Sequence, residues 1–348
     1  MRQWRDAAKV CGVYIGVIVG AGFASGQEVM RFFVCYGHDW VWGMGLAGLL
    51  FALSGWAALR LIRKERLRTY GDFCSRILGR RLGRAMEWVC GLFLFALFCT
   101  MTAGAGAAVQ ELLGWPRWIG AGILLAVCLA VFARGVKAMV AINAVLTPLL
   151  LAGGAALSAM AWRAGLLRNA GWAWLPGGLT RTAPAWIFSA IIYVSYNMVT
   201  TISVLLPLRG YLQDSRTPRR AGLVGGAAMT GLGMGLGATL YHARKRVWGK
   251  QLPLLAALGS LTPGLTAAYL AFFGAAVLTT AVGDGFAALE FFRNRFPGGQ
   301  RIWPLVLIAG AAAASRLDFS RWVSLVYPFF GYLGLLELAA LLLSFRKS

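Results

Sequence analysis

Long apolar runs alternate with short polar segments along the whole chain. Ten runs carry few or no charged residues, and they lie at 8–34, 40–59, 85–110, 118–133, 138–162, 183–208, 221–241, 263–289, 302–315 and 322–344. Most are close to the ~20 residues that an α-helix needs to cross a ~30 Å hydrocarbon layer. The pattern predicts an all-α membrane protein with about ten transmembrane helices.

The composition supports a lipid environment. Hydrophobic residues make up 59% of the 348 residues and charged residues 13%, whereas soluble domains carry roughly 25% charged residues. One very large soluble core is the alternative, but repeated runs of membrane-spanning length do not favour it.

The basic residues indicate an orientation rather than a nucleic-acid partner. The net charge is +22, and the Lys and Arg residues fall between the apolar runs, 23 on the side of the N-terminus and 11 on the other. Because cytoplasmic loops are enriched in Lys and Arg, we expect a multi-pass protein of the cell membrane with both termini in the cytoplasm. Nucleic-acid binding is not expected, since no basic stripe lies on a soluble domain.

The two halves of the chain resemble each other. A shift of 179 residues places the starts of the first five runs near those of the last five, and it matches Thr100 with Thr279, Gly104 with Gly283, Gly106 with Gly285, Ala108 with Ala287 and Glu111 with Glu290. Chance similarity between two Gly- and Ala-rich segments is the alternative. Five helices per unit require the second unit to be inverted. The chain is therefore predicted to comprise two five-helix repeats, 1–165 and 166–348, an arrangement typical of secondary transporters.

The first run contains a stretch that is poorly suited to a regular helix. Gly20, Gly22 and Gly26 lie within seven residues, and glycine costs about 1 kcal/mol relative to alanine in a helix. Close helix packing is one reason for such glycines. It does not explain the buried acid Glu28, although Arg31, one turn later, could pair with it. An unwound turn lining a cavity is the alternative that we favour.

Polar residues at mid-span mark two further runs. The sixth run contains Ser195 and Asn197, which lie beside Val199, the residue that the shift of 179 pairs with Gly20. This coincidence favours a shared site near the midplane, although such residues also join helices by hydrogen bonds. The eighth run contains Thr280 and Asp284, four residues apart and so on one helix face. Glu337 in the tenth run is given no role beyond that of a buried partner for another group.

These segments resemble a known family. The residues from Val19 to Glu28, those from Tyr193 to Met198 and the sequence Leu206-Pro207-Leu208 are similar to the YkvI-type bacterial membrane proteins of the amino acid–polyamine–organocation (APC) superfamily. The resemblance covers essentially the whole chain. It implies a LeuT-like fold with a five-plus-five inverted repeat, in which helices 1 and 6 are discontinuous.

The resemblance also implies site residues. The expected substrate-binding residues are Gly20, Ala21, Gly22, Phe23, Ser195, Tyr196 and Asn197. The expected Na⁺ ligands are the carbonyl groups of Gly16 and Val19 and the hydroxyl groups of Thr279 and Thr280, and Glu28 and Asp284 are candidates for a proton or charge relay. Two departures leave both Na⁺ and H⁺ coupling open: Phe23 replaces an amide of the neurotransmitter–sodium symporters, and helix 5 lacks the lysine of some proton-coupled relatives.

The predicted function is ion-coupled uptake, driven by Na⁺ or H⁺, of an amino acid or similar small zwitterion by alternating access. The alternative is a transporter-like ligand sensor or receptor subunit without net transport. An enzyme is not expected, because the apolar runs contain no histidine and no closely spaced acid pair to support hydrolysis. The expected partners are a small-molecule solute and the lipid bilayer. No cofactor is expected, apart from Na⁺ as a possible coupling ion.

Overall fold

The computed structural model describes residues 2–163, 182–258 and 263–346, and every regular element in these ranges is helical. The helices that run across the molecule are α1 (Arg2–Ile18), α4 (Trp40–Glu65), α6 (Arg80–Leu113), α7 (Arg117–Arg134), α8 (Val136–Arg163), α9 (Trp186–Leu205), α10 (Thr217–Val247), α12 (Pro263–Arg295), α13 (Trp303–Ala314) and α14 (Phe319–Arg346). Shorter elements connect them: α2 (Ala21–Ser25), α3 (Gln27–Phe32), η1 (Val34–Asp39), α5 (Tyr70–Leu78), η2 (Leu206–Tyr211), α11 (Pro253–Leu258) and η3 (Pro297–Gly299).

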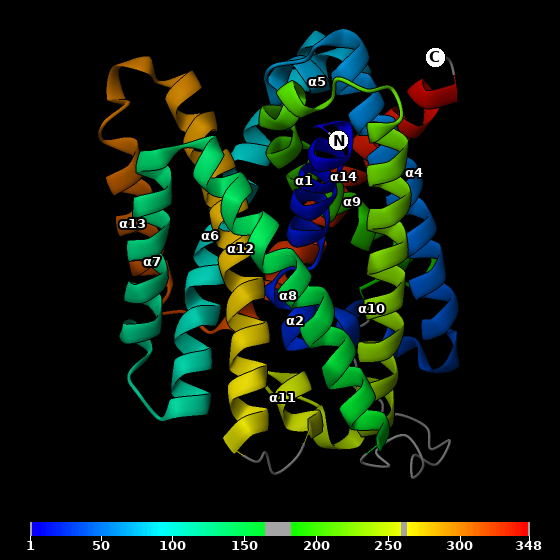
Figure 1. The fold of residues 1–348 in the computed structure, drawn as a ribbon, viewed down its shortest axis with the longest axis vertical. Coiled ribbons are helices and arrows are strands. Elements are labelled where there is room, and N and C mark those ends of the chain that lie inside the picture. Colours follow the sequence, from blue (N-terminus) through cyan, green and yellow to red (C-terminus); the bar gives the residue numbers. More distant parts are fainter. Residues whose placement is uncertain (1, 164–181, 259–262, 347–348) are drawn as a thin grey trace.

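Within the described ranges, eight helices are long and apolar enough to cross a membrane. The remaining two crossing helices, α1 and α13, have 17 and 12 residues. The predicted all-α membrane fold is therefore confirmed. Both ends of the chain lie at the same end of the molecule (Figure 1). We call this end the termini side and the opposite end the far side.

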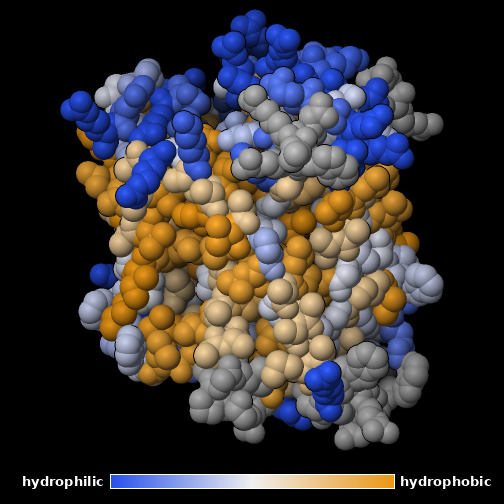
Figure 2. All heavy atoms as spheres, in the orientation of Figure 1, coloured by the Kyte–Doolittle hydropathy of each residue, from blue (hydrophilic) through white to orange (hydrophobic). Residues whose placement is uncertain are grey.

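The surface has the polarity expected of a protein in a bilayer. Figure 2 shows a broad apolar belt around the middle of the molecule and hydrophilic atoms gathered at the termini side. Large apolar side chains stand out from this surface, among them Trp118, Val145 and Leu325, each more than 70% exposed. Hydrocarbon rather than water is the favourable surrounding for such side chains.

Glycines bring α4 and α10 into close contact. A Cβ atom on Gly222 would lie 2.6 Å from the carbonyl oxygen of Ala52, and one on Gly226 would lie 2.5 Å from that of Gly48. The spacing of Gly222 and Gly226 is that of the small-xxx-small motif, which lets two helix backbones approach each other in a membrane.

The segment between α4 and α6 differs from the expected loop, because it contains the helix α5. Thr69 begins this helix with a capping box: its hydroxyl accepts a hydrogen bond from the Asp72 amide, while the Asp72 carboxylate accepts one from the Thr69 amide. This start signal lies in a polar sequence, where apolar runs give no guidance. The predicted boundary of the two repeats, at 165/166, lies outside the described residues.

We expect Gly226→Ala to destabilise the protein by about 1–3 kcal/mol, because the added methyl group collides with the backbone of α4. Gly231→Ala is the matched control, since a Cβ atom there meets no other atom within 4 Å. The control should be neutral or slightly stabilising, as alanine is the better helix former. Thermal unfolding in detergent measures both variants, and equal melting temperatures would contradict the close packing of α4 on α10.

Candidate functional site

The first transmembrane segment is broken, as predicted. Helix α1 ends at Ile18, α2 begins at Ala21, and α3 begins after Gly26. Gly26 has φ +87°, and a Cβ atom there would lie 3.1 Å from the backbone nitrogen of Leu254. The second interruption therefore requires glycine for both its backbone conformation and its surroundings. All residues of α2 are buried, so the broken backbone lies inside the protein rather than in lipid.

The sixth transmembrane segment departs from the prediction. Helix α9 is regular through the whole cluster from Tyr193 to Thr201 and changes to a 3-10 helix only at Leu206. The discontinuity in helix 6 that the resemblance implies therefore does not lie in the polar cluster but at the end of α9. The physical reason is that α9 contains neither glycine nor proline, while its polar side chains bond their own backbone.

Two polar side chains of the cluster form hydrogen bonds with the backbone of α9 itself. The Asn197 amide donates to the carbonyl of Tyr193 at 2.9 Å, and the Thr200 hydroxyl donates to that of Asn197 at 2.9 Å. The Ser195 hydroxyl instead donates to the carbonyl of Gly331 on α14. Ser195 therefore joins two helices, which was the alternative interpretation of the cluster, and it does not line the cavity described next.

A small cavity lined by buried residues lies where helix 1 is broken. Its volume is about 10 Å³, which is the space of roughly one water molecule. The lining residues come from helix 1 with α3, and from α6, α9, α12 and α14; they are Val17, Ile18, Gly20, Glu28, Leu97, Met101, Tyr196, Asn197, Thr200, Thr280, Asp284 and Tyr327. We call this the central cavity.

Several polar groups at the central cavity are buried without a partner. Within the described part of the chain, no hydrogen-bond partner is found for the Glu28 Oε2, Asp284 Oδ1, Thr280 Oγ1 and Tyr196 Oη atoms. Glu28 is 3% exposed and Asp284 1%. Buried polar groups are normally hydrogen-bonded, so four orphaned groups around one cavity indicate a binding site rather than a packing defect.

The structure brings together six of the residues selected from the sequence: Gly20, Glu28, Tyr196, Asn197, Thr280 and Asp284. Other selected residues are buried nearby but do not line the cavity: Gly16, Val19, Ala21, Gly22, Phe23, Ser195 and Thr279. The Thr279 hydroxyl donates to the carbonyl of Ala276 in its own helix at 3.0 Å. Its neighbour Thr280 faces Gly20, where an added Cβ atom would lie 2.9 Å from the Thr280 hydroxyl oxygen.

Glu28 and Arg31 do not form the ion pair that their spacing allows; among the described residues, Glu28 has no basic partner. The Glu28 carboxylate instead packs over Gly22 and lies beside the hydroxyl groups of Tyr193 and Tyr196. Arg31 lines a different cavity, on the far side.

Sequence reasoning missed Tyr327, which lines the central cavity from α14, and Asn143 on α8. The Asn143 Oδ1 atom is buried without a hydrogen-bond partner in the described structure, and a Cβ atom on Gly16 would lie 2.6 Å from it. An asparagine in the otherwise apolar run 138–162, with Thr147 one turn later, was a usable signal. Tyr327 gave none, because a tyrosine near a helix end is common at membrane interfaces.

Sequence comparison finds relatives that cover nearly the whole chain. No family model matches. The uncharacterized membrane protein YkvI of Bacillus subtilis (strain 168) is 26% identical over 338 residues, which are 97% of this chain and 95% of YkvI. The uncharacterized protein YyaD of the same organism is 25% identical over 349 residues, covering 98% of this chain and 97% of YyaD.

Solved structures of transporters share the arrangement of helices. MhsT in complex with L-phenylalanine superposes with a TM-score of 0.71 at 17% identity, covering 95% of this chain and 87% of MhsT. A Na⁺-coupled sialic acid symporter superposes with a TM-score of 0.67 at 12% identity, covering 95% of this chain and 78% of the symporter. Mhp1, a nucleobase-cation-symport-1 family transporter, superposes with a TM-score of 0.60 at 14% identity, covering 92% of this chain and 74% of Mhp1.

The chain resembles the YkvI-type membrane proteins and has the LeuT fold. The expectation drawn from the glycine stretch and the segment around Tyr193 is therefore confirmed at the level of fold. These structural neighbours are transporters, which agrees with the expectation that the chain is not an enzyme.

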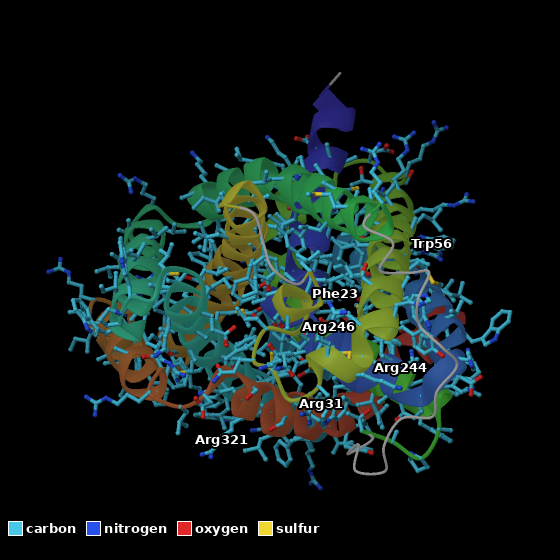
Figure 3. The ribbon with its side chains drawn as sticks, turned by 90° about the horizontal axis from the view of Figure 1, so that it is seen from below. Phe23, Arg31, Trp56, Arg244, Arg246 and Arg321 are labelled. Atoms are coloured by element: carbon cyan, nitrogen blue, oxygen red, sulfur yellow. The ribbon has the colours of Figure 1, made fainter. Side chains whose placement is uncertain are left out.

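Two further cavities of this LeuT-fold chain flank the central one. The far-side cavity has a volume of about 330 Å³ and is lined by Gln27 and by the bases Arg31, Lys250 and Arg321, among others. Figure 3 views this side and shows Phe23 near the middle of the molecule, Arg31 farther out and Arg321 closer to the rim. The termini-side cavity has a volume of about 90 Å³ and lies between α6, α9 and α12, with Tyr70 and Cys90 in its wall.

A hydrogen bond joins α5 to α14 beside that cavity. The Tyr70 hydroxyl of α5 donates to Glu337 Oε2 on α14, which supplies the partner that the sequence left unnamed for this acid. Burial, followed by the neighbouring Glu337, raises the pKa of Tyr70 well above its ordinary value, so the phenol keeps its proton as the donor. The bond ties α5 to α14.

We expect Tyr70→Phe to loosen the contact between α5 and α14 and to make Cys90, which is 1% exposed in the structure, more accessible. Loss of a buried hydrogen bond worth about 1 kcal/mol or more should speed the labelling of Cys90 roughly fivefold. Thiol labelling in membranes, read by mass of the Cys90 peptide, measures the rate. Tyr332→Phe is the control, because the Tyr332 hydroxyl, also on α14, donates to Thr182 instead. Equal Cys90 labelling in both variants would show that the bond between α5 and α14 does not limit access to Cys90.

Proposed function

We propose that the protein is a secondary active transporter that takes up an amino acid or a similar small zwitterion by alternating access. The observation that carries this proposal is the polar cavity at the break in helix 1, in a fold shared with Na⁺-coupled symporters. A membrane protein tolerates an interrupted helix and orphaned polar groups at mid-depth where they bind a solute or an ion.

The packing of the helices supports a rocking motion around this cavity. Helices α1, α4, α9 and α10 pack on one another, α6, α7, α12 and α13 form a second group, and α8 and α14 contact both groups. The central cavity is lined from both groups, by α1 and α9 on one side and by α6 and α12 on the other. Rotation of one group against the other would open it to the far side or to the termini side in turn.

The coupling ion is Na⁺ or H⁺, and each has candidate residues. Thr280 supports Na⁺, because its hydroxyl is buried without a partner and faces Gly20; oxygen atoms are the ligands that hard cations prefer. The carbonyl groups of Gly16 and Val19, with Thr279, complete the proposed ion site. Glu28 and Asp284 are the candidates for proton coupling.

The proposed orientation has both termini in the cytoplasm, so the far-side cavity faces outward in the cell membrane. The excess of Lys and Arg on the termini side supports this. The proposed internal symmetry, with repeats 1–165 and 166–348, is that of inverted-repeat transporters.

Uptake by the purified protein in liposomes tests the function. We expect uptake of at least one amino acid or amino compound under an inward Na⁺ or H⁺ gradient, and we expect Gly20→Ala to abolish it, because the methyl group reaches the Thr280 hydroxyl. Gly12→Ala is the control on the same helix, where a Cβ atom has only ordinary contacts at 3.9 Å. Saturable binding without uptake would contradict transport and favour a ligand sensor.

Thermal stabilisation by Na⁺ tests the ion site separately. We expect Thr280→Val to remove any Na⁺-dependent rise in melting temperature, since it removes the free hydroxyl but keeps the side-chain shape. Thr102→Val is the control, because the buried Thr102 hydroxyl donates to Phe98 in its own helix. A full Na⁺ response in Thr280→Val would eliminate this site, and H⁺ coupling through Glu28 or Asp284 would remain.

A further inference from the structure

We propose that the central cavity binds the ammonium group of an organic amine with net positive charge, held between the Glu28 and Asp284 carboxylates and beside the rings of Tyr196 and Tyr327. This inference rests on the proposed function and narrows its substrate class, from amino compounds in general to cationic ones.

The lining of the central cavity favours a positively charged group. Two carboxylates line this cavity, and none of its lining residues in the described structure is Lys, Arg or His. Each acid presents one oxygen atom without a hydrogen-bond partner in the described part of the chain, Oε2 of Glu28 and Oδ1 of Asp284. Buried charges are paired in proteins because desolvation is costly. A ligand that brings the missing positive charge and N–H donors satisfies both oxygens.

Aromatic rings surround Tyr196 at the central cavity. The Tyr196 ring has Tyr327 at 5.0 Å, Tyr193 at 5.4 Å and Phe32 at 5.6 Å between ring centroids. Aromatic faces attract cations, most strongly where water is excluded. Carboxylates combined with several tyrosine rings are a chemistry suited to an alkylammonium group, and the phenol hydroxyls can accept further N–H bonds.

A zwitterion would bring a carboxylate group to the break in helix 1. The start of α2 offers backbone N–H groups, which suit an anion, but Glu28 occupies the space beside it. A Cβ atom on Gly22 would lie 2.6 Å from Cδ of Glu28. A substrate carboxylate placed there would lie close to the Glu28 carboxylate, and like charges disfavour each other. An amine without a carboxylate avoids this conflict.

The basic residues of the far-side cavity do not change this balance. Arg31, Lys250 and Arg321 line that cavity and not the central one. Among the described residues that line the central cavity, Glu28 and Asp284 are therefore the only ones with an ionisable acid or base group other than the tyrosines.

Matched pairs of ligands test the proposal on the unaltered protein. The pairs are isobutylamine with valine, isoamylamine with leucine, phenethylamine with phenylalanine and ethanolamine with serine, which differ only in the α-carboxylate. Melting temperature in detergent is measured over a concentration series of each ligand. We expect at least one amine to stabilise the protein, and to do so at lower concentration than the amino acid with which it is paired.

Two substitutions then assign the residues. Glu28→Gln and Asp284→Asn should each weaken the apparent affinity for that amine about tenfold or more, as expected for the loss of a charged hydrogen bond. Glu65→Gln and Asp318→Asn are matched controls that remove surface carboxylates paired with Arg76 and Arg117, and they should leave the affinity unchanged.

The outcomes separate this inference from the proposed function. Stronger stabilisation by an amino acid than by its paired amine, or no stabilisation by any of the four amines, would overturn the cation site. Amino-acid uptake by the same preparation would then leave the transporter proposal intact. Because the ligand comparison uses the unaltered chain, it decides the matter even if a variant fails to fold.

Discussion

The structure depends on one constraint of the bilayer, which is that a peptide group without a hydrogen bond cannot face hydrocarbon. Helix 1 is interrupted at Val19–Gly20 and again at Gly26. The fold meets the constraint by burying all residues of α2, which lies between the two interruptions. Helix α12 contacts α2, and helices α9 and α10 contact α3. The interrupted backbone and its surrounding helices therefore form one unit.

The same constraint determines where charge is placed. Acids buried at mid-depth are rare in membrane proteins and mark functional sites. Three acids are buried among the described residues. In the described structure each of the three has one oxygen atom without a hydrogen-bond partner. The other oxygen atom of Glu337 accepts a hydrogen bond from Tyr70 and so joins α14 to α5, whereas Glu28 and Asp284 line the central cavity. The first acid thus serves the structure, and the other two are available to a ligand or a proton.

The sequence predicted the helices well and the site in part. Apolar runs fixed the crossings because lipid-facing helices must be apolar along a known length, and the glycine stretch revealed the break at Gly20. It did not reveal that α9 stays regular, because polar residues at mid-span are compatible both with an unwound turn and with bonds such as that from Asn197 to Tyr193. Contacts between distant helices, such as Tyr327 on the cavity, depend on three-dimensional packing that no local pattern encodes.

The most direct test of the account is an experimental structure determined with a transported amine and Na⁺ present. The account predicts density for the solute at the break in helix 1, in contact with Glu28 on α3 and Asp284 on α12. Solute bound only in the far-side cavity, or a helix that continues unbroken from Ile18 to Gln27, would contradict it.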